Sequence, residues 1–423
     1  MNNSIDILTL LGIDSEIVKS TQLISGEGNQ TTLYIELKDL RGFCPYCGSI
    51  NISIKDYYET EINDSIVKLN NLYVRVRNRR YKCNKCGKTF KQETNIYKKK
   101  ARISRLMEVD ILNDLKTFKT FSEVAKEHGI SVTEVVNIFD RKTKEIPLRL
   151  PKVLCIDELY FLHDKDKENK YICVLSNGEN GDIVDIIYSR KKAYLYEYFS
   201  KLKFDNMQNV KYFVSDMNDT YKNIHTHFFK NSYYVIDTFH VVQLFTNAIQ
   251  IIRKRLLKNN ELETAEYKYL KKNWKIFLKK GSELKKIKII DKNGVVKDPT
   301  IQLMDCLRKY PELFEAYMLK EDFLDYTKKQ NLSEATNFIN FFLDRMEISS
   351  IPEIKNIYFT IIKWEYPIIA GFCRNSYGLN VTNAMAEENN NRIRKLFGIS
   401  YGYHSFARAR ERILYIDRNK KTR

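Results

Sequence analysis

Three acidic residues stand in sequence contexts that suit metal-dependent chemistry on phosphodiesters. Asp157 closes the apolar run Val153–Ile156, Asp216 closes the run Tyr212–Ser215, and Glu387 lies in a polar segment near the C-terminus. Short apolar runs of this kind predict buried strands, and we expect the polar segment to be a helix. Two carboxylates at strand ends and a third on a helix can converge on two divalent metal ions, the arrangement that cleaves and rejoins phosphodiester bonds.

The polar segment carries further groups on the same predicted helix face. Asn390, Asn391 and Arg394 follow Glu387 at three, four and seven positions, so the four side chains share one side of a helix. That side offers a metal ligand, amide donors and a cation to one phosphate. Glu388 is an alternative ligand, but neighbouring helical residues point about 100° apart, so only one of the two glutamates faces the metals.

The composition points to a polyanionic partner. The chain has 423 residues, 71 lysines and arginines and 53 acidic residues, which gives a net charge of +18. This excess favours nucleic acid, although a merely soluble basic surface is the alternative. Apolar runs stay well short of the roughly 18 residues of a membrane span, and no signal-peptide pattern opens the chain. We therefore expect a cytoplasmic protein without a membrane partner.

Four of the eight cysteines form two matched pairs. Cys44 and Cys47 form the first pair, Cys83 and Cys86 form the second, and a glycine follows each pair. Two C-x2-C knuckles predict one tetrahedral, structural Zn2+ rather than a redox site. The alternating segment 72–77 between them predicts a strand with one arginine face. Candidate DNA contacts here are four arginines, although a purely structural ribbon is the alternative: Arg75, Arg77, Arg79 and Arg80. The single cysteines are expected to be small core residues: Cys155, Cys173, Cys306 and Cys373.

Residues 121–136 have the pattern of a helix-turn-helix. Ser122 is expected to cap the first helix, Gly129 to form the turn and Ser131 to cap the second helix. The expected buried positions of the second helix are Val132, Val135 and Val136. Thr133 and Asn137 would then face the major groove, beside the acidic Glu134. A plain helical hairpin is the alternative.

From residue 152 onward the pattern becomes strand–hairpin–helix–strand–helix–strand, the order of a ribonuclease H-like core. We therefore expect a multidomain α+β protein in which a helical insertion interrupts an α/β catalytic core. The basic insertion includes Lys271, Lys272 and Lys275 near Trp274, as candidate DNA contacts or as a solvated surface. The expected domains are a zinc ribbon (1–97), a helix-turn-helix (98–145), the first part of the core (150–240), the insertion (241–370), and the last core helix with a basic tail (371–423).

These features together resemble bacterial insertion-sequence transposases of the ISL-three family. The resemblance rests on Ile156-Asp157-Glu158, Asp216-Met217, the Asp237-x-x-His240 element and the segment Tyr401–Phe406, and on the domain order. It implies that Asp157, Asp216 and Glu387 form a DDE triad. The match of residues 390–394 to the family pattern favours Glu387 over Glu388. Asp237 and His240 would organise the site or contact DNA, with a structural pair as the alternative.

The resemblance also implies cofactors and partners. Two Mg2+ (or Mn2+) ions per site would cut the ends of a mobile element and join the 3′-hydroxyls to target DNA. Terminal inverted repeats and target DNA would be bound by a homodimer or higher homo-oligomer. The resemblance further implies a bacterial protein of the cytoplasm, associated with the nucleoid when bound to DNA. A non-enzymatic DNA-binding regulator, a nuclease of the same fold that cuts without joining, and an inactive copy remain as alternatives.

Overall fold

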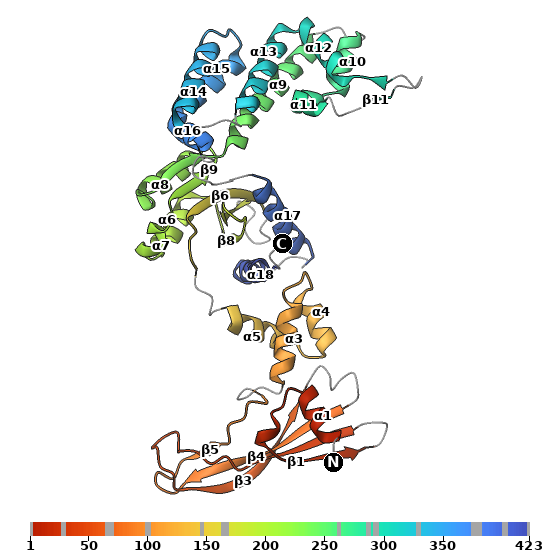
Figure 1. Cartoon of the computed structure of the whole chain (residues 1–423), viewed down its shortest axis with the longest axis vertical. Helices are drawn as coiled ribbons and strands as arrows, with labels where there is room; N and C mark the ends of the chain where they lie inside the picture. The colour runs from red at the N-terminus through yellow and green to blue at the C-terminus, as the bar shows by residue number, and fades with distance from the viewer. Residues whose placement is uncertain are drawn as a thin grey trace. The chain divides into compact units, whose positions relative to one another are not determined.

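The computed structural model describes most of the chain, and Figure 1 traces it from end to end. The described residues are 3–26, 31–63, 72–97, 103–143, 148–161, 169–259, 264–284, 289–290, 296–326, 331–373, 383–399 and 405–420. They fall into two compact units. The first contains residues 1–146 with two short segments, 398–401 and 419–423, and the second contains residues 147–397 and 402–418.

The first unit begins with a sheet packed under a short helix. Its elements are α1 (Asn3–Leu10), η1 (Ser15–Ile17), β1 (Val18–Ser25), β2 (Thr31–Leu37), β3 (Ile52–Ile62), β4 (Leu72–Cys83) and β5 (Thr89–Lys91). β4 pairs with β3 along most of its length, with β2 in parallel along its first half and with β5 along its second half. Alternate residues such as Ile35 and Val76 are fully buried, because successive side chains of a strand point to opposite faces. The strand expected at 72–77 is confirmed by β4.

Three helices follow in the same unit: α3 (Arg105–Asp114), α4 (Phe121–His128) and α5 (Val132–Thr143). Thr120, rather than the expected Ser122, caps α4, because Phe121 is already helical. The Thr120 Oγ1 accepts from the Glu123 N–H, and the Glu123 carboxylate accepts from the Thr120 N–H. Gly129 ends α4 with a φ of 55°, as expected of a left-handed turn.

The second helix of the pair, α5, differs from the expectation in its buried positions. Ser131 caps it as predicted, since its Oγ accepts from the Glu134 N–H at 3.1 Å. The buried stripe runs through Val135, Ile138 and Phe139. Val132, expected to be buried, lies in the first turn and is 43% exposed.

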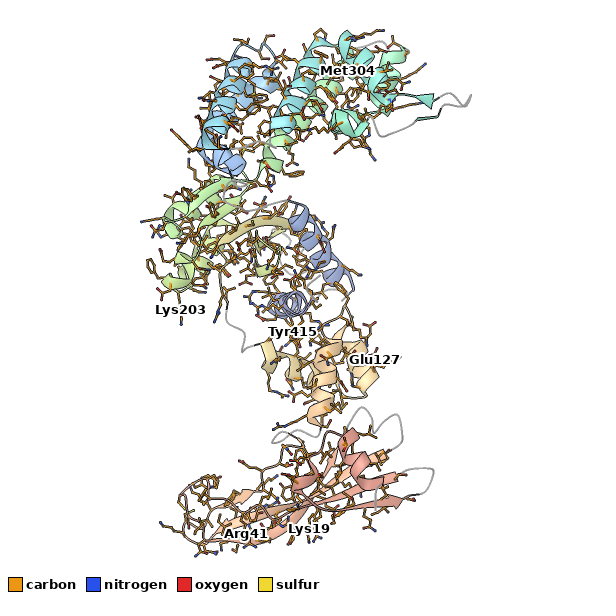
Figure 2. All side chains as sticks on the ribbon, viewed as in Figure 1. Lys19, Arg41, Glu127, Lys203, Met304 and Tyr415 are labelled. Atoms are coloured by element: carbon orange, nitrogen blue, oxygen red, sulfur yellow. The ribbon has the colours of Figure 1, made fainter. Side chains whose placement is uncertain are left out.

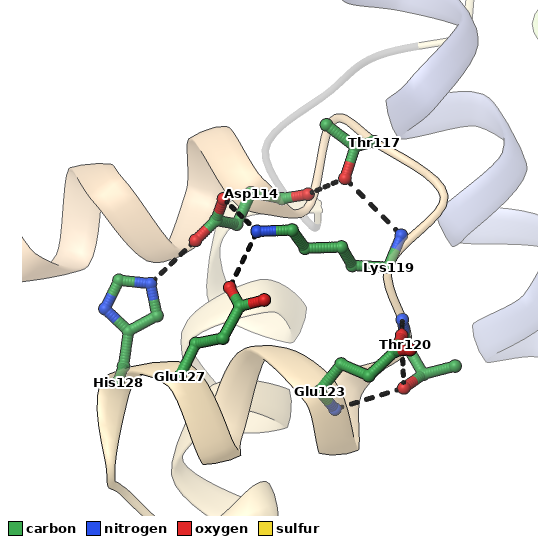
Figure 3. A network of polar contacts seen from close by, with 7 residues as sticks. All are labelled: Asp114, Thr117, Lys119, Thr120, Glu123, Glu127 and His128. Carbon is green, nitrogen blue, oxygen red and sulfur yellow. Dashed lines mark hydrogen bonds and ion pairs between the residues drawn. The ribbon is translucent and has the colours of Figure 1, made fainter.

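A polar network joins the end of α3 to α4 (Figure 3). The Asp114 carboxylate accepts from His128 Nε2 at 2.8 Å and from Lys119 Nζ at 3.0 Å. Lys119 also donates to Glu127 at 2.6 Å. The Asp114 carboxylate therefore binds both the connection between the two helices, through Lys119, and the last residue of α4, His128.

The second unit contains a five-stranded sheet. Its strands are β6 (Val153–Tyr160), β7 (Tyr171–Asn177), β8 (Ile183–Ile187), β9 (Tyr212–Ser215) and β10 (Tyr233–Ile236). The spatial order is β10-β9-β6-β7-β8, in which β6, β9 and β10 are parallel and β7 and β8 run antiparallel to their neighbours. These strands confirm the expected ones, except that β6 continues past Asp157 to Tyr160.

Helices cover this sheet. They are α6 (Lys192–Ser200), α7 (Phe204–Gln208) and α8 (Asp219–Phe228). Phe199 of α6 and Tyr221 of α8 are buried with Leu154 and Leu175 of the sheet. Val153 and neighbouring valines of β9 and β10 form a separate cluster that contacts Ala370. The core strands are thus covered by apolar groups from elements that precede and follow them in the chain.

The region expected to be a helical insertion is mainly helical. Its elements are α9 (Thr238–Asn259), α10 (Ala265–Lys272), η3 (Ile276–Leu278), α11 (Gly281–Leu284), β11 (Ile289–Ile290), β12 (Val296–Lys297), α12 (Pro299–Lys309), α13 (Pro311–Tyr326), α14 (Leu332–Glu347), α15 (Pro352–Lys363) and α16 (Glu365–Cys373). The rings of Phe245, Phe323 and Phe342 contact one another in tilted or edge-to-face arrangements in its core. Residues 291–295, between the two short strands, lie outside the described residues.

Two helices complete the second unit: α17 (Asn383–Ile399), whose last two residues are counted in the first unit, and α18 (Phe406–Arg418). The sequence suggested a basic tail here, but much of α18 is buried. Tyr415, labelled in Figure 2, is 4% exposed and Arg412 is fully buried. Among the described residues, no helix is long and apolar enough to cross a membrane.

Candidate active site and zinc site

Asp157 and Asp216 occupy the same level of two neighbouring parallel strands. Cys155 of β6 pairs with Val214 of β9 in parallel register. Asp157 follows Cys155 by two residues and Asp216 follows Val214 by two, so the two aspartates lie side by side. Asp157 lies inside β6, opposite Val174 of β7, and not at a strand end as expected. Asp216 does follow the last residue of its strand, as predicted. The sheet therefore brings together two carboxylates that are 59 positions apart (216 − 157) in the sequence.

The neighbouring Glu158 has partners of its own. Its carboxylate accepts from the Tyr221 hydroxyl at 2.8 Å and pairs with Arg190 at 2.5 Å. Asp157 instead accepts from the Nδ2 of Asn390 at 3.1 Å. The two acids follow each other in a strand, so their side chains point to opposite faces. Glu158 is thereby tied to α8, and Asp157 to α17.

Asp216, like Asp157, is half-buried. Its Oδ1 is shielded from solvent and has no hydrogen-bond partner among the described residues. Burial raises the pKa of Asp216 to about 6; His240 opposes this shift, and the carboxylates of Glu158 and Asp157 add to it. A buried carboxylate oxygen without a partner is costly unless a cation or donor compensates it.

Asp237 directly precedes α9, and His240 lies in the first turn of that helix. The Asp237 N–H donates to the Ser215 carbonyl at 3.1 Å, and its carboxylate accepts from the Phe239 N–H at 3.1 Å. Asp237 therefore caps the first turn of α9. His240 lies close enough to Asp216 to lower the pKa of that carboxyl. The structure thus gives Asp237 a local capping contact and places His240 near the second aspartate.

The helix α17 carries the third acid. The backbone of Glu387 belongs to α17, while its side chain lies outside the described residues; Glu388 is exposed. Asn391 and Arg394 are exposed and hydrogen-bonded to each other at 3.1 Å. Since Asn390 reaches Asp157, the side of α17 that bears Asn390 is the side that meets the sheet.

Sequence reasoning missed a set of buried polar residues around α17. Asn389 is 2% exposed and donates to the Gly181 carbonyl at 2.7 Å. Arg392 pairs with Asp417 of α18, which is 1% exposed. Periodicity does not reveal such contacts, because each depends on a partner that is distant in sequence. The available signal was a run of polar residues in a helix that has to pack on a sheet.

The four paired cysteines form one cluster. Their sulfur atoms lie within 4.8 Å of one another, with Cys44 to Cys86 at 3.7 Å and Cys47 to Cys83 at 3.6 Å. Tetrahedral Zn2+ with ordinary Zn–S bonds requires sulfur separations of about 3.8 Å. Each knuckle closes on a glycine with positive φ, at positions 48 and 87. This is the one metal-type cluster among the described residues, and its donor set fits zinc.

The four candidate DNA-contacting arginines of β4 already have partners within the protein. Arg79 is 4% exposed, donates to the Leu37 carbonyl and pairs with Glu36. Its assignment as a DNA contact is corrected, because its guanidinium is committed inside the protein. The other three arginines each have a partner on β3: Arg75 with Glu61, Arg77 over the Tyr57 ring, and Arg80 with Asp56.

The knuckle end of the same sheet has a different character. Lys82, Lys85, Lys88 and Lys91 are exposed and have no carboxylate partner among the described residues. Lys88 lies over the Tyr46 ring and Lys91 over the Tyr58 ring, both at 4.7 Å. We call these four residues the knuckle lysines. The sequence analysis did not identify these lysines as candidates, although they recur at every third position and could have been recognised as a basic cluster.

The remaining sequence candidates are exposed. Thr133 and Asn137 lie on the solvent side of α5. Lys271, Lys272 and Lys275 are exposed near the end of α10, and Lys275 lies over the Trp274 ring at 5.5 Å. All five are accessible to a partner. The segment 401–404, part of the sequence resemblance, lies outside the described residues.

Comparison with known families bears on both regions. A family model for transposases of the ISL3 type, with a DDE catalytic domain, matches residues 154–413, from β6 to α18. A second model, for the zinc finger of transposases IS204/IS1001/IS1096/IS1165, matches residues 41–86, which include all four paired cysteines. The curated proteins yielded no match. The first model covers more than half of the sequence, so this chain is a member of the ISL3 family of transposases.

Proposed function

We propose that this transposase cleaves and joins DNA at a two-metal site made by Asp157, Asp216 and Glu387. The observation that carries the proposal is the hydrogen bond from Asn390 to Asp157, which brings α17 against the two aspartates. Glu387 precedes Asn390 by three residues and therefore lies about 60° from it around the helix axis. Glu388 lies about 160° away, on the exposed side. The strand order β10-β9-β6-β7-β8, with its two antiparallel strands, supports a ribonuclease H-like core.

The donor set suits Mg2+ or Mn2+. Hard divalent cations take oxygen ligands, and the unpartnered Oδ1 of Asp216 beside Asp157 is such a ligand. When bound, two such ions activate the attacking hydroxyl and neutralise charge on the phosphate. Asn390 holds one oxygen of Asp157 in place. Asn391 and Arg394 are exposed, and in this proposal they donate hydrogen bonds to the DNA backbone.

DNA binding is assigned to three surfaces. The first is the α4–α5 pair, proposed as a helix-turn-helix in which Thr133 and Asn137 of α5 enter the major groove. The second is the end of α10, where Lys271, Lys272 and Lys275 surround an exposed Trp274. The third is the zinc ribbon. We further propose that a homodimer or larger assembly holds the two element ends and the target.

Within the ribbon, the knuckle lysines are the stronger candidates for phosphate contact. Arg75 and Arg80 would have to exchange a carboxylate partner for DNA, whereas the knuckle lysines would not. Each phosphate that a cation neutralises contributes about 0.9 to the slope of log K against log salt. Replacing Lys85, Lys88 and Lys91 by alanine should therefore lower the slope by about 2.7. A matched Arg75→Ala, Arg77→Ala variant should change it by less than about 1. The reverse ranking would restore the arginine face as the contact.

The catalytic proposal is tested with labelled DNA that carries the ends of the element, in Mg2+ or Mn2+. Wild-type protein should cut and join, and Asp157→Ala, Asp216→Ala and Glu387→Ala should abolish both reactions while leaving DNA affinity largely intact. Glu388→Ala is the matched control and should remain active. Cutting without joining would indicate a nuclease. Tight binding without chemistry in wild type would indicate a regulator or an inactive copy.

A further inference from the structure

The rotation of α17 about its own axis decides which of its side chains meet Asp157. One residue along a helix is a turn of about 100°, so a modest rotation would replace Asn390 by a different side chain. Apolar contacts of Ile393 and Leu396 hold the helix on the unit but specify its angle poorly. Directional polar contacts specify it better, because a hydrogen bond weakens steeply as its geometry departs from linear.

Two such contacts bracket Asn390. One residue before it, the buried Asn389 donates from Nδ2 to the carbonyl of Gly181, in the turn between β7 and β8. Two residues after it, Arg392 donates to Asp417 of α18 and, at 3.3 Å, to the Oδ1 of Asn389. The amide of Asn389 is thereby oriented from both sides.

Asp417 is itself fixed to the sheet. Its side chain is fully buried, and its second oxygen accepts from the backbone N–H of Ile183, the first residue of β8, at 2.7 Å. Along the same helix, Arg410 binds both oxygens of the buried Asp185 of β8, at 2.5 and 2.6 Å. α18 is thus held on β8 at two points, one of which continues to α17.

We infer that Asn389 and the Arg392–Asp417 pair are positioning residues of the catalytic site, with α18 acting as a brace between β8 and α17. They set the rotation of α17 at which Asn390 reaches Asp157. This inference rests on the proposed function of Asp157 and Glu387. A buried carboxylate shared between a backbone N–H and an arginine is costly to leave unpaired, so removal of one partner should disturb the other.

The test compares Asn389→Ala, Arg392→Ala and Asp417→Asn with Arg418→Ala, an exposed neighbour on α18 that serves as the matched control. Three quantities are measured: Mn2+ affinity from the electron paramagnetic resonance signal of free Mn2+, the cleavage rate on element-end DNA, and thermal unfolding. The three variants should lose at least tenfold in cleavage rate and several-fold in Mn2+ affinity at a temperature where all remain folded. The control should match wild type.

The double variant Arg392→Ala, Asp417→Asn separates positioning from general weakening. If both residues act through one contact, the double variant cleaves no more slowly than the worse single variant. Rate losses that follow the unfolded fraction, with unchanged Mn2+ affinity, would overturn the inference. Wild-type protein that neither binds Mn2+ nor cleaves would instead overturn the proposed function. Asp157→Ala, which lacks a proposed metal ligand, gives the Mn2+ affinity and cleavage rate against which wild type is compared to recognise that case.

Discussion

Gly371 in α16 allows a close approach between a helix and the strand beside the candidate active site. A Cβ at this position would lie 2.4 Å from the carbonyl oxygen of Ile236, the last residue of β10. Real Cβ atoms essentially never approach a backbone oxygen so closely, so Gly371→Ala must displace α16 or β10. Because Asp237 follows Ile236 directly, a displacement of β10 would also shift Asp237 and disturb the neighbouring carboxylates of Asp216 and Asp157.

The magnitude follows from two opposing effects. Glycine to alanine in a helix gains at most about 1 kcal/mol through helix propensity. Overpacking against fixed neighbours costs about 1–3 kcal/mol, and a backbone carbonyl held in a sheet belongs at the upper end of that range. The net result is a loss of about 2 kcal/mol. Gly398→Ala in α17 is the matched control, since its Cβ would meet nothing within 4 Å.

The assay is urea unfolding followed by tryptophan fluorescence. Both tryptophans, Trp274 and Trp364, belong to the second unit, and Trp364 is 3% exposed. Gly371→Ala should lower the urea midpoint and should slow DNA cleavage even without urea. Gly398→Ala should leave the midpoint unchanged or raise it. Equal midpoints for the two variants would refute the steric argument.

Three further outcomes are expected from the first unit. Purified protein should contain one Zn2+ per chain, and Cys44→Ser should lose it and unfold the ribbon while leaving the tryptophan emission of the second unit unchanged, as metal analysis and fluorescence would report. Thr120→Ala removes the cap of α4 and should destabilise the helix by about 1 kcal/mol, measured as faster amide hydrogen exchange in 121–128. Burial raises the pKa of Asp114, but hydrogen bonds from His128 and Lys119 outweigh it and keep the pKa below its ordinary value. The stabilisation is therefore present above the unfolded pKa of about 3.9 and is lost as pH falls through the lowered folded value. Protection of the α3 and α4 amides against hydrogen exchange should decline on acidification in wild type, and should decline less in Asp114→Asn.

Local features of this protein follow from short stretches of its sequence. Two C-x2-C pairs with following glycines are sufficient to predict the zinc ligands, because ligand spacing within a knuckle is a local property. Alternation and apolar runs located the strands at 72–77 and around Asp157 and Asp216, and Gly129 and Ser131 marked the turn before α5. The family resemblance, confirmed by the match over 154–413, also depended on short motifs.

Features that join distant segments depend on how the chain folds. Arg79 belonged to an alternating arginine face in sequence, yet it is buried because Glu36 and the Leu37 carbonyl lie across the sheet. Likewise the segment that resembled a basic tail contains Asp417, whose partners Ile183 and Arg392 come from β8 and α17. The energy of a buried polar group depends on where its partner lies after folding, and no pattern along the chain records that position.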